Sequence, residues 1–147
     1  MIVFDANALM MPVECNVRVF EELDRVAAEL TDVGTGGGGG AGASGDGDSD
    51  TTDYVVPRAV LDELERLASG AGEAATAAGV GLDLARDHCR VVDHEADHGD
   101  GAVLECATRE GVTAAVTNDK PLRSRLLDAG VPVISLRGAN KLAVTRP

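Results

Sequence analysis

Lysine and aromatic residues are both scarce in this chain of 147 residues. Two lysines stand against eleven arginines, and the aromatic residues are two Phe and one Tyr, with no Trp. Val, Leu, Ile and Ala must therefore fill the interior, which the apolar share of 44% allows. A chain of this length predicts a single domain, spanning 1–147, with its own hydrophobic core.

Three further absences limit the class of protein. No apolar run approaches the roughly 20 residues that a membrane-spanning helix needs, so we expect no membrane partner. The N-terminus lacks the basic start and small-residue cleavage pattern of a signal peptide. The three cysteines form no C-x-x-C pair, and their odd number argues against a secreted disulfide framework. We expect a cytoplasmic protein.

The charge is strongly negative and unevenly distributed. The net charge is −12, and this acidic, lysine-poor composition resembles that of halophilic proteins from high-salt cytoplasm. Residues 117–147 are positively charged instead, with six basic and two acidic side chains. Such a cationic end on an acidic body is a candidate surface for the phosphates of a nucleic-acid backbone, and an ordinary solvated helix face explains it equally well. The candidate backbone-binding residues are Lys120, Arg123 and Arg125.

Apolar runs that suit strands alternate with helical patterns along the chain. This alternation predicts an α/β fold in which a mainly parallel sheet carries helices on both faces. Ligands bind such sheets beyond the carboxyl ends of the strands. We expect strands at 2–4, 54–56, 90–92, 114–117 and 132–136, and helices at about 12–30, 57–69, 73–88, 100–110 and 120–129.

One segment differs in kind from the rest. Residues 34–53 are rich in Gly and Asp and contain no basic residue. We interpret them as a disordered insertion that interrupts the domain without ending it. They lack the Lys-Ser/Thr of a P-loop and the spaced glycines of a dinucleotide-binding turn.

Two acids lie where the predicted sheet would bind a ligand. Asp5 directly follows the first strand, and Asp119 closely follows the fourth. Each has an alternative interpretation as a helix cap, as has Asp100, and Glu63 alone suits a solvent-exposed helix face. Converging carboxylates repel one another unless a cation binds them, and hard cations prefer oxygen ligands.

The order of four short motifs is more specific than any acid alone. VFDANAL (3–9), VLDELERL (60–67), GDGAVLECA (99–107) and VTNDKPLRSRL (116–126) resemble the four signatures of the PIN-domain nucleases. The resemblance implies a three-layer α/β/α fold around a mainly parallel, five-stranded sheet. It also implies cleavage of single-stranded RNA with Mg²⁺ or Mn²⁺. The catalytic, metal-binding acids that it implies are Asp5, Glu63, Asp100 and Asp119, with Asn7, Thr117 and Asn118 as supporting polar residues.

One departure from the family pattern concerns the number of metals. Many members carry a second acid beside the third one, where this chain has Gly101. The departure weakens a second metal position, for which Asp97 is a poor substitute. It also keeps open a non-catalytic RNA-binding or scaffold role.

The branch of the family is indicated by two stretches, 7–12 and 56–68. They are similar to an archaeal branch related to ribosomal-RNA processing nucleases, whose partners would be RNA and ribosome-assembly factors. VapC-type toxins share the fold, and that alternative implies an antitoxin partner. The family resemblance also suggests a homodimer.

A competing motif is His94-Glu95-Ala96-Asp97-His98, which matches the H-E-x-x-H pattern of zinc metalloproteases. That chemistry needs both histidines on one face of a continuous helix. The run has almost no apolar residue, and a strand end and a glycine flank it. We interpret it as an exposed loop, with incidental zinc capture together with His88 and Cys89 as a weaker alternative.

Overall fold

The computed structural model describes residues 1–35 and 53–147. Apart from its ends, the Gly/Asp-rich insertion predicted at 34–53 lies outside the described residues. The described part contains these elements: β1 (Ile2–Phe4), α1 (Ala6–Glu14), α2 (Val19–Thr35), β2 (Tyr54–Pro57), α3 (Arg58–Ala68), α4 (Glu73–His88), β3 (Cys89–Val92), α5 (Gly99–Ala107), β4 (Ala114–Val116), α6 (Lys120–Asp128), β5 (Val133–Arg137) and β6 (Lys141–Thr145).

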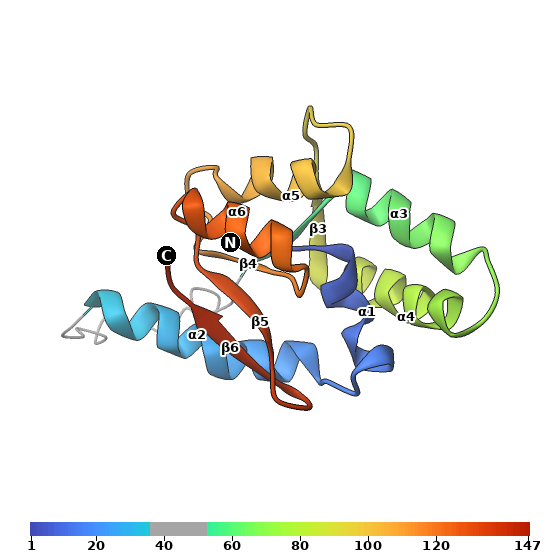
Figure 1. The fold of residues 1–147 in the computed structure, drawn as a ribbon, viewed down its shortest axis with the longest axis horizontal. Helices are drawn as coiled ribbons and strands as arrows, with labels where there is room; N and C mark the ends of the chain where they lie inside the picture. Colours follow the sequence, from blue (N-terminus) through green and yellow to red (C-terminus); the bar gives the residue numbers. More distant parts are fainter. Residues whose placement is uncertain (36–52) are drawn as a thin grey trace.

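A single sheet of the order β3-β2-β1-β4-β5-β6 organises the molecule. The strands from β3 to β5 pair in parallel, and β6 pairs antiparallel with β5. Helices α5 and α6 lie on one side of the sheet and α2 and α4 on the other (Figure 1). The predicted mainly parallel α/β/α architecture is therefore confirmed.

The strand order reverses beside β1. The chain passes outward from β1 to β2 and β3, then returns through α5 to place β4 on the other side of β1. This reversal makes the β1–β4 boundary a topological switch point, where open α/β sheets bind ligands beyond the carboxyl ends of the strands. Both strands are fully buried, as expected of apolar strands that are covered on two faces.

Two elements differ from the prediction. The single helix expected at 12–30 is wrong, because α1 begins at Ala6 and ends at Glu14, before a break that includes Asn16 with a positive φ of 55°. Nearly every residue of the first two turns of α1 is buried, so this segment shows no amphipathic period. The sheet also has a sixth strand, β6, where five strands were predicted.

The few aromatic side chains gather in one place. Phe4 stacks on Phe20 with ring centroids 5.4 Å apart, and Tyr54 meets both rings edge-on. The cluster joins β1, α2 and β2 and so fixes α2 against the sheet.

No helix in the described part of the chain is long and apolar enough to cross a membrane.

Candidate active site

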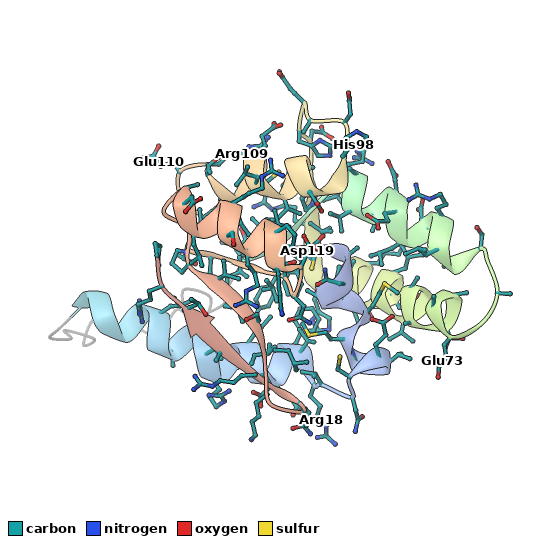
Figure 2. All side chains as sticks on the ribbon, in the orientation of Figure 1. Arg18, Glu73, His98, Arg109, Glu110 and Asp119 are labelled. Carbon is teal, nitrogen blue, oxygen red and sulfur yellow. The ribbon has the colours of Figure 1, made fainter. Side chains whose placement is uncertain are left out.

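Asp5 and Asp119 meet at the switch point because β1 and β4 are neighbours in the sheet. Asp5 directly follows β1, and its backbone N–H donates to the Val116 carbonyl on β4 at 3.0 Å. Asp119 is the N-cap of α6, where its Oδ2 accepts a hydrogen bond from Leu122 N at 3.1 Å. Figure 2 places Asp119 at the start of α6, facing α1. Each acid therefore caps a helix, and the carboxylates of both lie beyond the carboxyl ends of β1 and β4.

The Asp5 carboxylate is buried and held in one orientation. Only 5% of its surface is exposed. Its Oδ1 accepts from Ala6 N at 2.8 Å, and its Oδ2 accepts from Thr117 Oγ1 at 2.7 Å and from Asn7 Nδ2 at 3.0 Å. Three donors compensate in part for the loss of hydration of this carboxylate.

The pKa of Asp5 is nevertheless raised above its ordinary value of 3.8. Burial is the largest cause, because it disfavours the charged form. The hydrogen bonds from Thr117 and Ala6 lower the pKa, and the negative charges of Asp100 and Glu63 raise it. These two acids come from α3 and α5.

All four predicted acids line one pocket of about 210 Å³, which we call the acidic pocket. Four separated segments of the chain supply them. The residues that line the acidic pocket are Asp5, Ala6, Asn7, Met10, Glu63, Asp100 and Asp119. The structure thus brings the four acids together, while Ala6 and Met10 complete the wall without any sequence signal that marks them.

Glu63 and Asp100 reach the acidic pocket from the outer helices. Asp100 lies in the first turn of α5, and Glu63 lies in the middle of α3. A Cβ added at Gly99 would lie only 3.1 Å from Glu63 Oε1. The absence of a side chain at Gly99 therefore lets the Glu63 carboxylate approach the N-terminus of α5, where the helix dipole favours negative charge.

The three supporting polar residues have different roles. Thr117 is fully buried, and its Oγ1 also accepts from Asp119 N at 3.1 Å, so it links the two central acids. Asn7 Oδ1 accepts from Asn118 N at 2.9 Å, which ties α1 to the loop after β4. The Asn118 side chain turns away from the acids, since its Oδ1 accepts from Leu136 N at 2.8 Å. Asn118 therefore positions the β4–α6 loop against β5.

Gly101 stands where the family pattern suggests another acid. A Cβ added there would meet the Ala96 Cβ at 3.2 Å, so a larger residue would require the Ala96 side chain to shift by a few tenths of an ångström. Asp97 is exposed and is absent from the lining of the acidic pocket. The loop before α5 is thus built around glycine at this position.

The donor chemistry of the acidic pocket suits a hard cation. Its polar lining consists of four carboxylates and one amide, with no His or Cys, and such all-oxygen sites favour Mg²⁺ or Mn²⁺ over Zn²⁺. Within residues 1–35 and 53–147, no group of three His, Cys, Asp or Glu side chains forms a ready-made metal site. Mg²⁺ keeps several of its waters and typically needs only one or two carboxylates, so spaced carboxylates fit a hydrated ion.

The His94–His98 run is a loop, as predicted, and not a helix. His94 is half-buried rather than exposed: its Nε2 accepts from Ala59 N at 2.9 Å, and its Nδ1 lies 2.9 Å from the Ala96 carbonyl. Glu105 accepts the N–H groups of Glu95 and Ala96. These contacts anchor the loop that leads to Asp100 and leave the histidines without the helical spacing of a zinc protease.

The predicted RNA-backbone residues lie on α6. Lys120 and Arg125 are exposed, and Arg123 is half-buried. The Nε–H of Arg123 is buried and has no hydrogen-bond partner in the part of the chain that the structure describes.

Comparison with known proteins identifies one family. A family model described as a PIN like domain matches residues 2–33 and 48–139. Among solved structures, the fold is similar to that of the PIN domain endonuclease Utp24, with a TM-score of 0.70 and 19% identity over 99% of this chain and 91% of that chain. At this identity the likeness shows the fold alone. No curated protein matches the chain.

Proposed function

This chain belongs to the PIN-like domain family, and from that premise we propose that it is a metal-dependent endoribonuclease that cleaves single-stranded RNA at the acidic pocket. The observation that carries the proposal is the meeting of four acids from four separate segments in one small cavity. A group of unpaired carboxylates is costly unless a cation binds among them. The carboxylates also lie at the switch point, the usual binding position in such sheets.

A bound Mg²⁺ or Mn²⁺ would activate a water molecule and neutralise charge on the scissile phosphate. Asp5 is the central ligand in this proposal, because Thr117 and Asn7 hold its carboxylate in a fixed orientation. Asp119 would present the carboxylate oxygen that does not cap α6. Glu63 and Asp100 would complete the site, in part through water.

The cations of α6 would hold the RNA backbone beside the acidic pocket. Phosphate contacts of this kind position a nucleic acid without reading its sequence. Lys120 and Arg125 are exposed next to Arg123 and would add affinity that weakens with salt.

Among cellular roles, we propose ribosomal-RNA processing over toxin action. The support is the resemblance of residues 7–12 and 56–68 to the archaeal processing branch. A processing role requires RNA and ribosome-assembly factors as partners, whereas a toxin requires an antitoxin and arrests growth on expression. Co-expression with and without neighbouring open reading frames, with growth as the readout, separates the two roles.

Cleavage of an end-labelled single-stranded RNA tests the proposed activity. We expect cleavage with Mg²⁺ or Mn²⁺, none in EDTA, and a loss of at least about 100-fold in Asp5→Asn, which removes a proposed ligand charge. The matched control is Asp62→Asn, because Asp62 is an exposed acid beside Glu63 on α3. Equal loss in both variants, or cleavage that persists in EDTA, would count against the acidic pocket.

A second candidate function is an RNA-binding or scaffold module without turnover. It is favoured by Gly101, where the family pattern suggests an acid and the loop leaves little room for one. This candidate predicts RNA binding and no metal-dependent cleavage by the wild-type protein. Cleavage that the Asp5→Asn variant abolishes would exclude it.

A further inference from the structure

A second pocket, of about 470 Å³, lies where α2 meets the β5–β6 hairpin. Three cationic side chains line it, and none of the described residues in its lining is acidic. Figure 1 shows α2 running alongside the hairpin, so residues far apart in the chain form this pocket. We call it the hairpin pocket, and its lining residues are Arg25, Arg137, Lys141, Leu142, Ala143 and Val144.

The guanidinium of Arg25 is fixed in place before any ligand binds. Its Nη2 donates to Glu22 Oε1 at 2.7 Å and to the Leu142 carbonyl at 2.8 Å. Glu22 Oε1 in turn accepts from Leu142 N at 3.1 Å. The ion pair with Glu22 offsets part of the charge of Arg25, so Arg25 shapes the pocket while Arg137 and Lys141 would contribute most of the affinity for an anion.

Arg137 and Lys141 form a like-charge pair across the hairpin. They are directly opposite in the register of β5 and β6, and both are exposed. Neither makes an ion pair within the described residues. Like charges directly opposite on neighbouring strands destabilise a sheet, and a bound anion between them would reverse the sign of that interaction.

The hairpin pocket and the acidic pocket lie at the same end of the sheet, beyond the carboxyl ends of β5 and β4. Val116 pairs with Ile134, and both strands run in the same direction. Asp119 lies three residues beyond Val116, and Arg137 lies three residues beyond Ile134. Because neighbouring strands are about 4.8 Å apart, β6 lies roughly 10 Å across the sheet from β4. One extended strand of nucleic acid can therefore reach both pockets.

We propose that Arg25, Arg137 and Lys141 bind a backbone phosphate of the RNA, a short way along the strand from the bond that is cut. The proposal rests on the proposed function, and it adds that the substrate is an extended single strand long enough to follow the sheet edge. Two exposed cations beside a fixed guanidinium suit a phosphodiester, which needs charge and hydrogen bonds but no base-reading groups. The surrounding acidic surface would keep the strand on this path.

Binding of fluorescent oligouridines in EDTA tests this path without cleavage. The double variant Arg137→Gln/Lys141→Gln removes the two exposed cations and leaves neutral polar side chains in their place. The control is Arg86→Gln, since Arg86 is an exposed arginine on α4 that pairs with the exposed Glu65. Anisotropy is measured against KCl concentration for a dinucleotide and for a strand of roughly a dozen nucleotides.

We expect the double variant to bind the longer strand about tenfold less tightly. The slope of log K against log salt should flatten by about 0.7 for each phosphate contact that is lost. The dinucleotide has a single internucleotide phosphate and cannot place phosphates in both pockets, so it should bind equally to all three proteins.

Unchanged affinity and slope for the longer strand would overturn the proposal. So would binding of inorganic phosphate that the double variant abolishes while RNA affinity stays the same, since the pocket would then serve a free anion. Failure of the wild-type protein to bind RNA would also overturn it. The nuclease proposal is tested separately by cleavage: wild-type protein that binds through the hairpin pocket and never cuts would contradict only the nuclease proposal.

Discussion

Asp5 carries a carboxylate that is almost completely buried, and burial destabilises the charged form of a carboxylate. Its raised pKa means that the folded chain holds this proton more tightly than the unfolded chain does. The resulting contribution to stability is full below its ordinary pKa of 3.8 and is lost as the pH rises through the raised value. At neutral pH the ionised Asp5 therefore costs stability, as expected of a residue kept for function.

The hydroxyl of Thr117 is the group that most lowers the pKa of Asp5. We expect Thr117→Val to raise that pKa further, so that the acid limb of kcat/KM moves to higher pH. At acidic pH the variant should be about tenfold less active than wild type, since a hydrogen bond to a charged group contributes about 1.5–3 kcal/mol. The two profiles should converge as the pH rises.

The control for Thr117→Val is Thr113→Val. The Thr113 hydroxyl donates to the Met1 carbonyl at 3.1 Å, at the end of β4 remote from the acids. This variant should leave the pH profile unchanged. A shift of the Thr117→Val profile to lower pH, or a loss that is uniform across all pH values, would contradict the role given to Thr117.

Some residues of the site could be predicted from local sequence patterns and others could not. Asp5 and Asp119 could be placed at one sheet edge, because the ends of neighbouring parallel strands determine their position. Glu63 and Asp100 were found only through the order of motifs, since neither helix pattern indicates which way a carboxylate points. The outward turn of Asn118 and the contribution of Arg25 to the hairpin pocket depend on tertiary contacts, which local patterns do not contain.

The position of Asp5 depends on the close contact between the backbones of α1 and α4. A Cβ added at Gly81 on α4 would lie 2.9 Å from the Leu9 carbonyl oxygen on α1. Because the clash is with backbone, the helices themselves would have to separate. Glycine at 81 therefore lets α1, which Asp5 caps, pack directly on α4.

We expect Gly81→Ala to lower the free energy of unfolding by about 1–3 kcal/mol through overpacking. It should also reduce cleavage, because α1 carries Asp5 at its N-terminus. Gly79→Ala, on the same helix, is the matched control, since no atom lies within 4 Å of its added Cβ. That variant should gain up to about 1 kcal/mol from helix propensity. Denaturant unfolding measures the free energy of unfolding of both variants. Equal changes in the two variants would show that the contact between Gly81 and Leu9 does not limit the packing of α1 on α4.

Two elements were not predicted, for different physical reasons. Helix α1 begins directly after β1 and is buried on most sides, so its apolar residues look like a continuation of the strand. Strand β6 lies at the edge of the sheet, and it is held by β5 and by the side chains of Arg25 and Glu22. Both elements depend on packing that becomes visible only in the folded chain.

Across the whole molecule, a net charge of −12 makes self-repulsion a general cost of folding. At molar salt the Debye length falls to about 3 Å, which screens this repulsion. We expect the melting temperature to rise by on the order of 5 °C from low salt to molar KCl, which corresponds to roughly 1–2 kcal/mol for a domain of this size. Differential scanning calorimetry in KCl and in choline chloride measures the effect.

The two salts should act alike, because screening depends on ionic strength and not on the identity of the cation. A melting temperature that is independent of salt would show that the acidic surface does not limit stability. The same screening would allow an acidic protein to approach RNA at high salt, with the cationic residues of 117–147 as the contact surface.

The proposed function requires that four carboxylates from distant segments hold a divalent cation. An anomalous difference map from a crystal soaked in Mn²⁺ would locate that cation. We expect a manganese peak within the acidic pocket, with at least one oxygen of Asp5 or Asp119 at about 2.0–2.3 Å. A map in which ordered manganese binds elsewhere on the acidic surface, with the acidic pocket empty, would contradict it.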